Sequence, residues 1–80
     1  MNQDITFCAF RYALGRQTYV VGEVARYIII HKHEFSQKYV DLMKKEIQEA
    51  ISKGHAGHEI DVAEWRNVYE QLSLIKPCQQ

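Results

Sequence analysis

The chain has 80 residues, of which 46% are hydrophobic and 25% charged, and its ten basic and ten acidic residues give a formal net charge of zero. These values are those of one ordinary globular domain, near the lower size limit at which a single core holds a chain folded. Zero net charge counts against a general nucleic-acid binder, because such proteins carry a basic field that displaces counterions.

The sequence shows no sign of secretion or membrane insertion. Its first residues, MNQDITF, include an acid and lack the basic segment of a secretory signal. The longest apolar run, YIII at residues 27–30, is far too short to span a bilayer. Two cysteines near opposite ends, Cys8 and Cys78, are typical of reduced thiols. We therefore expect a cytoplasmic protein without a membrane segment.

A short first helix is predicted over residues 5–14. Asn2 or Asp4 can cap its start, and Gly15 suits the position after its end because glycine tolerates a positive φ. Its apolar residues form two stripes, Ile5, Cys8 and Tyr12 on one side and Phe7, Phe10, Ala13 and Leu14 on the other. A helix that is apolar on nearly every side is buried centrally or covered by a partner.

The second predicted element follows Thr18, a candidate N-cap, and runs through YVVGEVARYIIIHKH. Its β-branched residues also suit a strand. Apolar residues nevertheless recur at helical spacing for three turns, with Glu23 and Arg26 opposite, which favours a helix. Gly22 weakens that helix by about 1 kcal/mol relative to alanine, and it can let another backbone approach closely.

The third predicted helix is the clearest of the four. Ser36 caps it, it covers residues 37–53, and Gly54 ends it. The residues predicted to face the core are Tyr39, Met43, Ile47, Ala50 and Ile51, and Val40 lies beside this stripe.

The fourth helix is predicted to begin at Asp61, which forms an acidic capping box with Glu64, while Ile60 packs onto Trp65 as a hydrophobic staple. Its apolar face comprises Val62, Trp65, Val68, Tyr69 and Leu72. Pro77 precedes a frayed tail, so the ordered core covers about residues 4–75. The sequence thus predicts an all-α, compact four-helix single domain with short connections.

Four histidines raise the question of a metal site. His31 and His33 follow the second helix, and His55 and His58 follow the third, so the two pairs could meet if those connections were adjacent. Neither spacing matches a zinc signature, and neither cysteine is near a pair. We expect solvated loop histidines and no metal site.

The sequence shows no pattern of residues that indicates a catalytic site. Cys8 lies on an apolar helix face, where cysteine behaves as a small hydrophobe. The carboxylates of Asp61 and Glu64 occupy capping positions, and the sequence contains no glycine-rich phosphate loop. We expect a protein that is not an enzyme and uses no cofactor.

Arginines and tyrosines gather in the first two helical segments, around Gly15. Both residue types are enriched at the energetic centres of interfaces, and arginine also grips phosphates and carboxylates. The alternative is that each arginine pairs with a local acid and that the tyrosines belong to the core. The candidate partner-binding residues are Arg11, Tyr12, Arg16, Tyr19, Arg26 and Tyr27.

Two helices joined by a short glycine-containing turn also fit the outline of a helix–turn–helix. The second helix would then read DNA, yet YVVGEVARYIII is too apolar to contact base edges. Nucleic-acid binding is therefore a minority interpretation.

The block AFRYALGRQTYVVGEV at residues 9–24, with the later EIQEAI and DVAEW, resembles a group of small phage and prophage proteins. Their signature is Phe-Arg-Tyr-Ala-Leu-Gly-Arg, then Thr-Tyr and a hydrophobic stretch, with Asp-x-x-x-Trp near the end. The resemblance covers about residues 7–72, and its first block is the specific part. It implies an accessory protein that binds a host component, as small anti-CRISPR inhibitors of bacterial defence do, and it carries over no catalytic residue.

We therefore expect a phage-encoded protein that acts in the host bacterial cytoplasm by binding and sterically inhibiting a host protein, with a CRISPR-Cas-type defence component as the expected target. Two alternatives stay open: a small DNA-binding transcriptional regulator of a phage, and a binder that sequesters nucleotides through its arginines. A homodimer is compatible with each, since nine aromatic residues and an apolar first helix offer more surface than one copy covers.

Overall fold

The computed structural model describes residues 2–15 and 20–75. This part of the chain forms α1 (Gln3–Ala13), α2 (Val20–Ile30), the short 3-10 helix η1 (Lys32–Glu34), α3 (Gln37–Ser52) and α4 (Glu59–Ser73). The prediction of an all-α four-helix domain is confirmed, and the second segment is helical rather than extended. The predicted cap Thr18 and the predicted tail from Pro77 onward lie outside the described residues.

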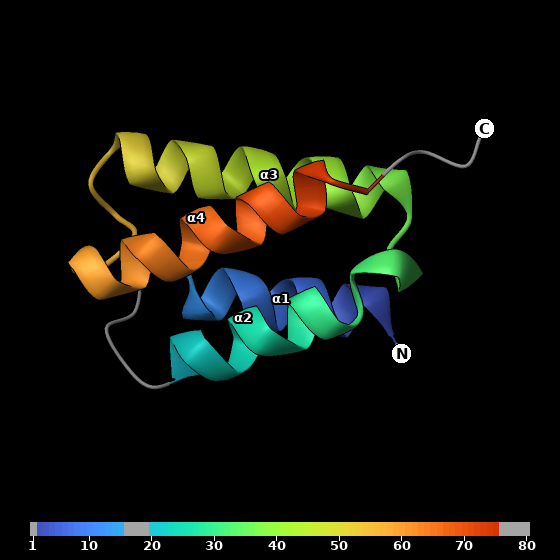
Figure 1. Ribbon diagram of the computed structural model, residues 1–80. Helices are drawn as coiled ribbons and strands as arrows, with labels where there is room; N and C mark the ends of the chain where they lie inside the picture. Colours follow the sequence, from blue (N-terminus) through green and yellow to red (C-terminus); the bar gives the residue numbers. More distant parts are fainter. Residues whose placement is uncertain (1, 16–19, 76–80) are drawn as a thin grey trace.

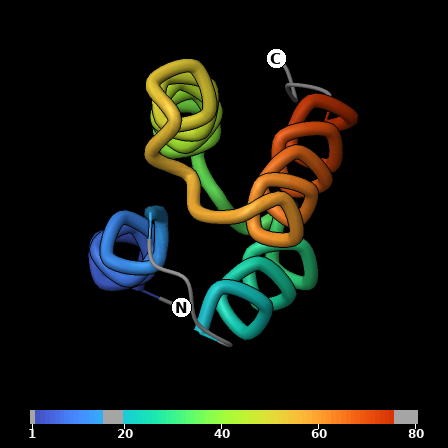
Figure 2. Tube along the Cα trace, turned by 90° about the vertical axis from the view of Figure 1, so that its left-hand side faces the viewer, coloured from blue at the N-terminus to red at the C-terminus, as the bar shows by residue number. Residues whose placement is uncertain are grey.

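The four helices lie at the corners of a square, as the end-on view shows (Figure 2). The hairpin of α1 and α2 forms one layer and the hairpin of α3 and α4 forms the other (Figure 1). Across the layers α1 packs beside α3, and α2 packs beside α4. The connection through η1 therefore crosses the bundle diagonally, from α2 to α3.

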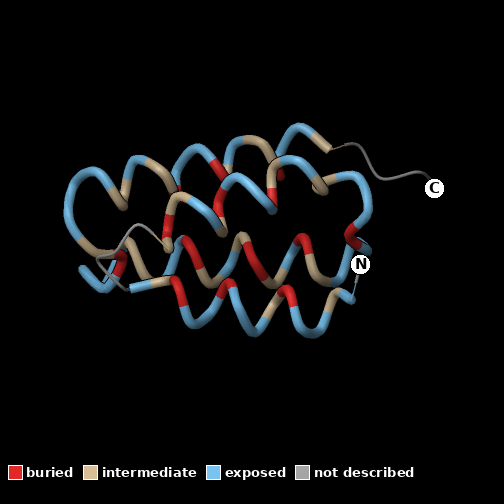
Figure 3. Tube along the Cα trace, turned by 90° about the horizontal axis from the view of Figure 1, so that it is seen from below, coloured by how far each residue is buried: buried red, intermediate tan, exposed pale blue. Residues whose placement is uncertain are grey.

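One apolar core lies between the two layers. Buried positions alternate with exposed ones along every helix, the pattern of amphipathic helices around a common centre (Figure 3). At that centre the rings of Phe10 and Trp65 meet nearly edge to face, with centroids 5.5 Å apart, a geometry worth about 0.5–1.5 kcal/mol beyond burial. The other core residues are Ala13, Val21, Ala25, Ile28, Phe35, Val40, Met43, Ile47, Ala56, Val68 and Leu72.

Local hydrogen bonds set the start of α1 and both ends of α3 where the sequence predicts them. The second helix is shorter than predicted, because α2 ends at Ile30 and the residues Lys32–Glu34 form η1. Asn2 caps α1 by accepting a hydrogen bond from the Ile5 amide at 3.1 Å. Ser36 caps α3 through its hydroxyl oxygen, which accepts from the Tyr39 amide at 3.4 Å. Gly54 follows α3 with φ +74°, and the His55 amide donates to the Ala50 carbonyl at 2.7 Å, the closing bond of a Schellman motif.

The predicted start of α4 is wrong. The helix begins at Glu59 with His58 as its N-cap, three residues before the predicted cap Asp61. Asp61 occupies the third helical position instead, where its carboxylate accepts a hydrogen bond from the His58 amide at 3.1 Å. The predicted staple of Ile60 onto Trp65 is also wrong, because Ile60 is 79% exposed while Trp65 is fully buried.

Candidate interaction surface

The outer side of the α1–α2 hairpin carries an apolar surface. It is formed by Ile5, Cys8, Ala9 and Tyr12 of α1 together with Val24 and Tyr27 of α2, and we call it the α1–α2 face. The four α1 residues recur at helical spacing, so they share one side of that helix over about 10 Å. The side of α1 that faces the core is formed instead by Thr6, Phe10 and Ala13.

The α1–α2 face carries three exposed large hydrophobic side chains. Ile5 is 67% exposed, Tyr12 61% and Tyr27 41%. These are three of the six large hydrophobic side chains that are exposed in the described part of the chain. Single exposed apolar residues are ordinary, whereas several on one contiguous face mark an interaction site. Of the two sequence-based alternatives for α1, burial at the centre and cover by a partner, central burial is wrong.

A groove of about 380 Å³ runs between the two helices of this face. Ile5 and Ala9 form its α1 wall, and Val24 and Tyr27 form its α2 wall, with Glu23 at the margin. The Tyr27 ring also lies against the imidazole of His31, with ring centroids 4.3 Å apart. The face therefore offers a recess with aromatic and aliphatic walls and a polar border.

Cys8 is exposed on this face. The predicted apolar helix face is the exposed one, so the Cys8 side chain lies at the surface rather than in the core. Exposure follows from its position on the side of α1 opposite the core residues Phe10 and Ala13.

The arginines of the predicted cluster point to other sides of the bundle. Arg11 lies on the α3 side of α1, where its Nε is 4.0 Å from a carboxylate oxygen of Glu46. Arg26 lies on the α4 side of α2, beside Glu64, and its guanidinium is 3.6 Å from a carboxylate oxygen of Glu23.

The structure thus brings Tyr12 and Tyr27 onto one face and directs Arg11 and Arg26 away from it. Both arginines have acidic neighbours, as the alternative interpretation of the cluster expects. The remaining two predicted residues, Arg16 and Tyr19, lie outside the described residues.

The two histidine pairs lie at opposite ends of the bundle. His31 and His33 precede α3, and His55 and His58 follow it, so the whole length of that helix, about 24 Å, separates them. The idea that the two connections are adjacent is therefore wrong. Among the described residues, no group of three or more histidine, cysteine or acidic side chains is arranged to hold a metal ion.

His31 has a local role at the end of α2. Its Nδ1 and a carboxylate oxygen of Glu34 are 2.5 Å apart. This hydrogen bond, aided by the nearby imidazole charge, holds the pKa of the Glu34 carboxyl below the usual range for glutamate. The pair fixes the turn that leads from α2 into η1.

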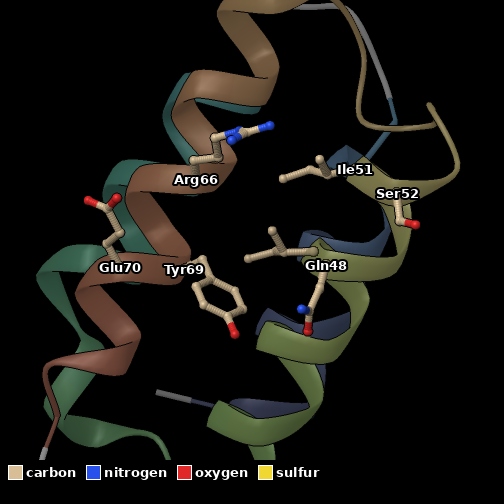
Figure 4. A pocket seen from close by; sticks show the side chains of 7 residues that line it. Gln48, Ile51, Ser52, Arg66, Tyr69 and Glu70 are labelled. Atoms are coloured by element: carbon tan, nitrogen blue, oxygen red, sulfur yellow. The ribbon is translucent and has the colours of Figure 1, made fainter.

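A second groove, which was not predicted from the sequence, lies on the other layer. It has a volume of about 480 Å³ and lies between α3 and α4 (Figure 4). Its walls are formed by Ile47, Gln48, Ile51, Ser52, Arg66, Tyr69 and Glu70. The sequence places Gln48 and Ile51 on one side of α3, and Arg66 and Tyr69 on one side of α4. That these two sides face each other follows only once α3 and α4 are known to be neighbours.

Comparison of the chain with models of protein families, with curated proteins and with solved structures finds no match. In the described part of the chain, no helix is both long and apolar enough to cross a membrane.

Proposed function

We propose that this protein works by binding another protein through its α1–α2 face and blocking that protein's surface, without catalysis and without a cofactor. The observation that carries the proposal is the exposed apolar surface built around Ile5, Tyr12 and Tyr27. Tyrosine supplies a large, stiff contact area, and such residues dominate the binding energy of interfaces. The recess between the two helices gives a partner side chain a place to enter.

The proposed partner is a host protein in the bacterial cytoplasm, of the CRISPR-Cas defence type. The resemblance of residues 9–24 to small phage and prophage proteins supports this target. The α1–α2 face supports the mode of action, since a protein of 80 residues can obstruct a larger one by covering part of its surface.

The test is capture of the tagged protein from a bacterial host that carries defence systems, followed by mass spectrometry. We expect one stoichiometric host protein, and we expect Ile5→Arg to abolish its recovery because a desolvated charge would lie in the apolar contact. Ile60→Arg is the matched control, since the Ile60 side chain is also largely exposed but lies at the start of α4. Both variants should keep the thermal stability of the parent.

Three results would contradict the proposal. Equal recovery of the partner by the Ile5→Arg and Ile60→Arg variants would place the interface elsewhere. Recovery of nucleic acid alone would favour a regulator. Recovery of the protein only with itself would assign the α1–α2 face to a homodimer, which a mass measurement in solution would show.

A further inference from the structure

The groove between α3 and α4 combines an apolar interior with Arg66, a cation in its lining that pairs with no carboxylate among the described residues. Ile47 lies fully buried at its base, and Ile51 and Tyr69 form its apolar walls. Its volume of about 480 Å³ falls within the range of about 300–1,000 Å³ that small-molecule sites occupy. Polar groups stand at the margin, on Gln48, Ser52 and Glu70.

Arg66 differs from the other arginines that the structure describes. Arg11 lies beside Glu46 and Arg26 beside Glu23, whereas no carboxylate in the described residues pairs with Arg66. Figure 4 shows the Arg66 side chain extending from α4 across the groove toward Ile51. An unpaired guanidinium above an apolar wall is a ready donor to a carboxylate.

Glu70 is the acid that would be expected to neutralise Arg66, because it lies one turn later on α4. Arginine four residues before glutamate is the weaker order for such a pair, since the reverse order agrees with the helix dipole. Glu70 borders the groove, but Figure 4 shows its carboxylate on the other side of α4 from the Arg66 guanidinium. The positive charge is therefore left facing the apolar interior.

A second cation, Lys44, adds positive charge near the Tyr69 wall of the groove. The ammonium of Lys44 lies 5.3 Å from the centroid of the Tyr69 ring, which forms part of the wall. The charges around the apolar interior thus comprise two cations, Lys44 and Arg66, and one acid, Glu70, at the margin. This distribution complements a ligand with one negative charge.

We propose that the α3–α4 groove is a binding site for a small amphipathic monocarboxylate, an acid with an aliphatic or aromatic body. The body lies between Ile51 and Tyr69, and the carboxylate accepts hydrogen bonds from the Arg66 guanidinium. The site lies on the α3–α4 layer, opposite the α1–α2 face. It is therefore independent of the proposed function, and the test of one does not decide the other.

Phenylbutyrate is a suitable probe, with phenylbutanol as the uncharged control of nearly the same shape. In a titration of the ¹⁵N-labelled protein followed by NMR, we expect saturable shifts of the amides of Ile51, Arg66 and Tyr69. Phenylbutanol should bind at least about tenfold more weakly, because a hydrogen bond between charged groups is lost.

Arg66→Gln should weaken phenylbutyrate binding by a similar factor of at least about ten, and Arg26→Gln, another exposed arginine on a different helix, should leave it unchanged. The comparison of acid with alcohol on the parent protein decides the question even if the Arg66→Gln variant fails to fold. Three results overturn the site: no shifts at millimolar acid, shifts confined to other residues, or equal binding of acid and alcohol.

Discussion

At Gly15 the backbone of the first hairpin closely approaches the backbone of the second. The Gly15 φ of +91° is one that side-chain-bearing residues rarely adopt, and a Cβ there would lie 2.7 Å from the His55 carbonyl oxygen. The turn after α1 and the connection between α3 and α4 are therefore in backbone contact. The role of Gly15 at the end of α1 could be predicted from the sequence, but its close approach to His55 depends on how the two hairpins pack.

Gly15→Ala should destabilise the protein by about 2–4 kcal/mol, because backbone strain adds to a clash with a rigid carbonyl. Gly54→Ala is the matched control: Gly54 has φ +74° but nothing within 4 Å of its added Cβ. It should cost only the strain, about 1–2 kcal/mol. Chemical denaturation measures both changes, and equal losses would show that Gly15 does not touch the second hairpin.

Glu34 gives the stability of the protein a dependence on acid pH. Because its folded pKa is lowered by the His31 hydrogen bond, its contribution is present above the unfolded pKa and is lost as the pH falls through the folded pKa. The melting temperature of the parent should therefore exceed that of Glu34→Gln at pH values above about 5, and the two should converge below the ordinary glutamate value of about 4.3. Glu49→Gln, at an exposed position of α3, is the control. A constant difference between the parent and Glu34→Gln from neutral to acid pH would contradict this role.

At the scale of the element, α2 shows how a helix can form from residues that also suit a strand. The residues Val21, Ala25 and Ile28 are buried together, and their spacing puts them on one side of a helix. Burial of that side against α1 and α4 outweighs the modest strand preference of valine and isoleucine. Periodicity therefore predicts the element better than residue propensity does.

Gly22 does not serve the close backbone approach suggested for it. A Cβ at this position would find only a Glu64 carboxylate oxygen, at 3.7 Å, an ordinary contact distance. Gly22→Ala should therefore stabilise the protein by about 0.5–1 kcal/mol, the difference in helix propensity. Denaturant unfolding measures the gain, and a loss of stability would mean that α2 and α4 lie closer together than described.

The start of α4 shows how a sequence pattern can mislead. Asp61 and Glu64 have the spacing of a capping box, but the carboxylate of Asp61 completes a cap that begins at His58. Histidine is not among the residue types that favour the N-cap, so residue type alone points to Asp61 rather than His58. The error in the predicted helix start also explains the error at Ile60. This residue faces solvent on the first turn of α4 instead of covering Trp65.

At the scale of the whole molecule, helical periodicity was enough to predict four helices and most of the core, including Phe10, Met43 and Trp65. The surfaces were harder to predict. Two apolar stripes on α1 do not show which one faces the core, and the directions of Arg11 and Arg26 depend on which helices become neighbours. Since α1 and α2 are adjacent to α3 and α4 respectively, the two arginines diverge and the tyrosines are left on the α1–α2 face.

The most direct test of that face is the reactivity of Cys8 with a maleimide, measured with and without the captured host protein, in a chain carrying Cys78→Ser. Cys8 is exposed within the α1–α2 face, so a bound partner should slow its labelling at least about tenfold. A cysteine introduced by Ala63→Cys on the exposed side of α4, in a chain lacking both natural cysteines, should label at the same rate in both conditions. If Cys8 labels equally fast in the complex, the α1–α2 face is not the binding surface.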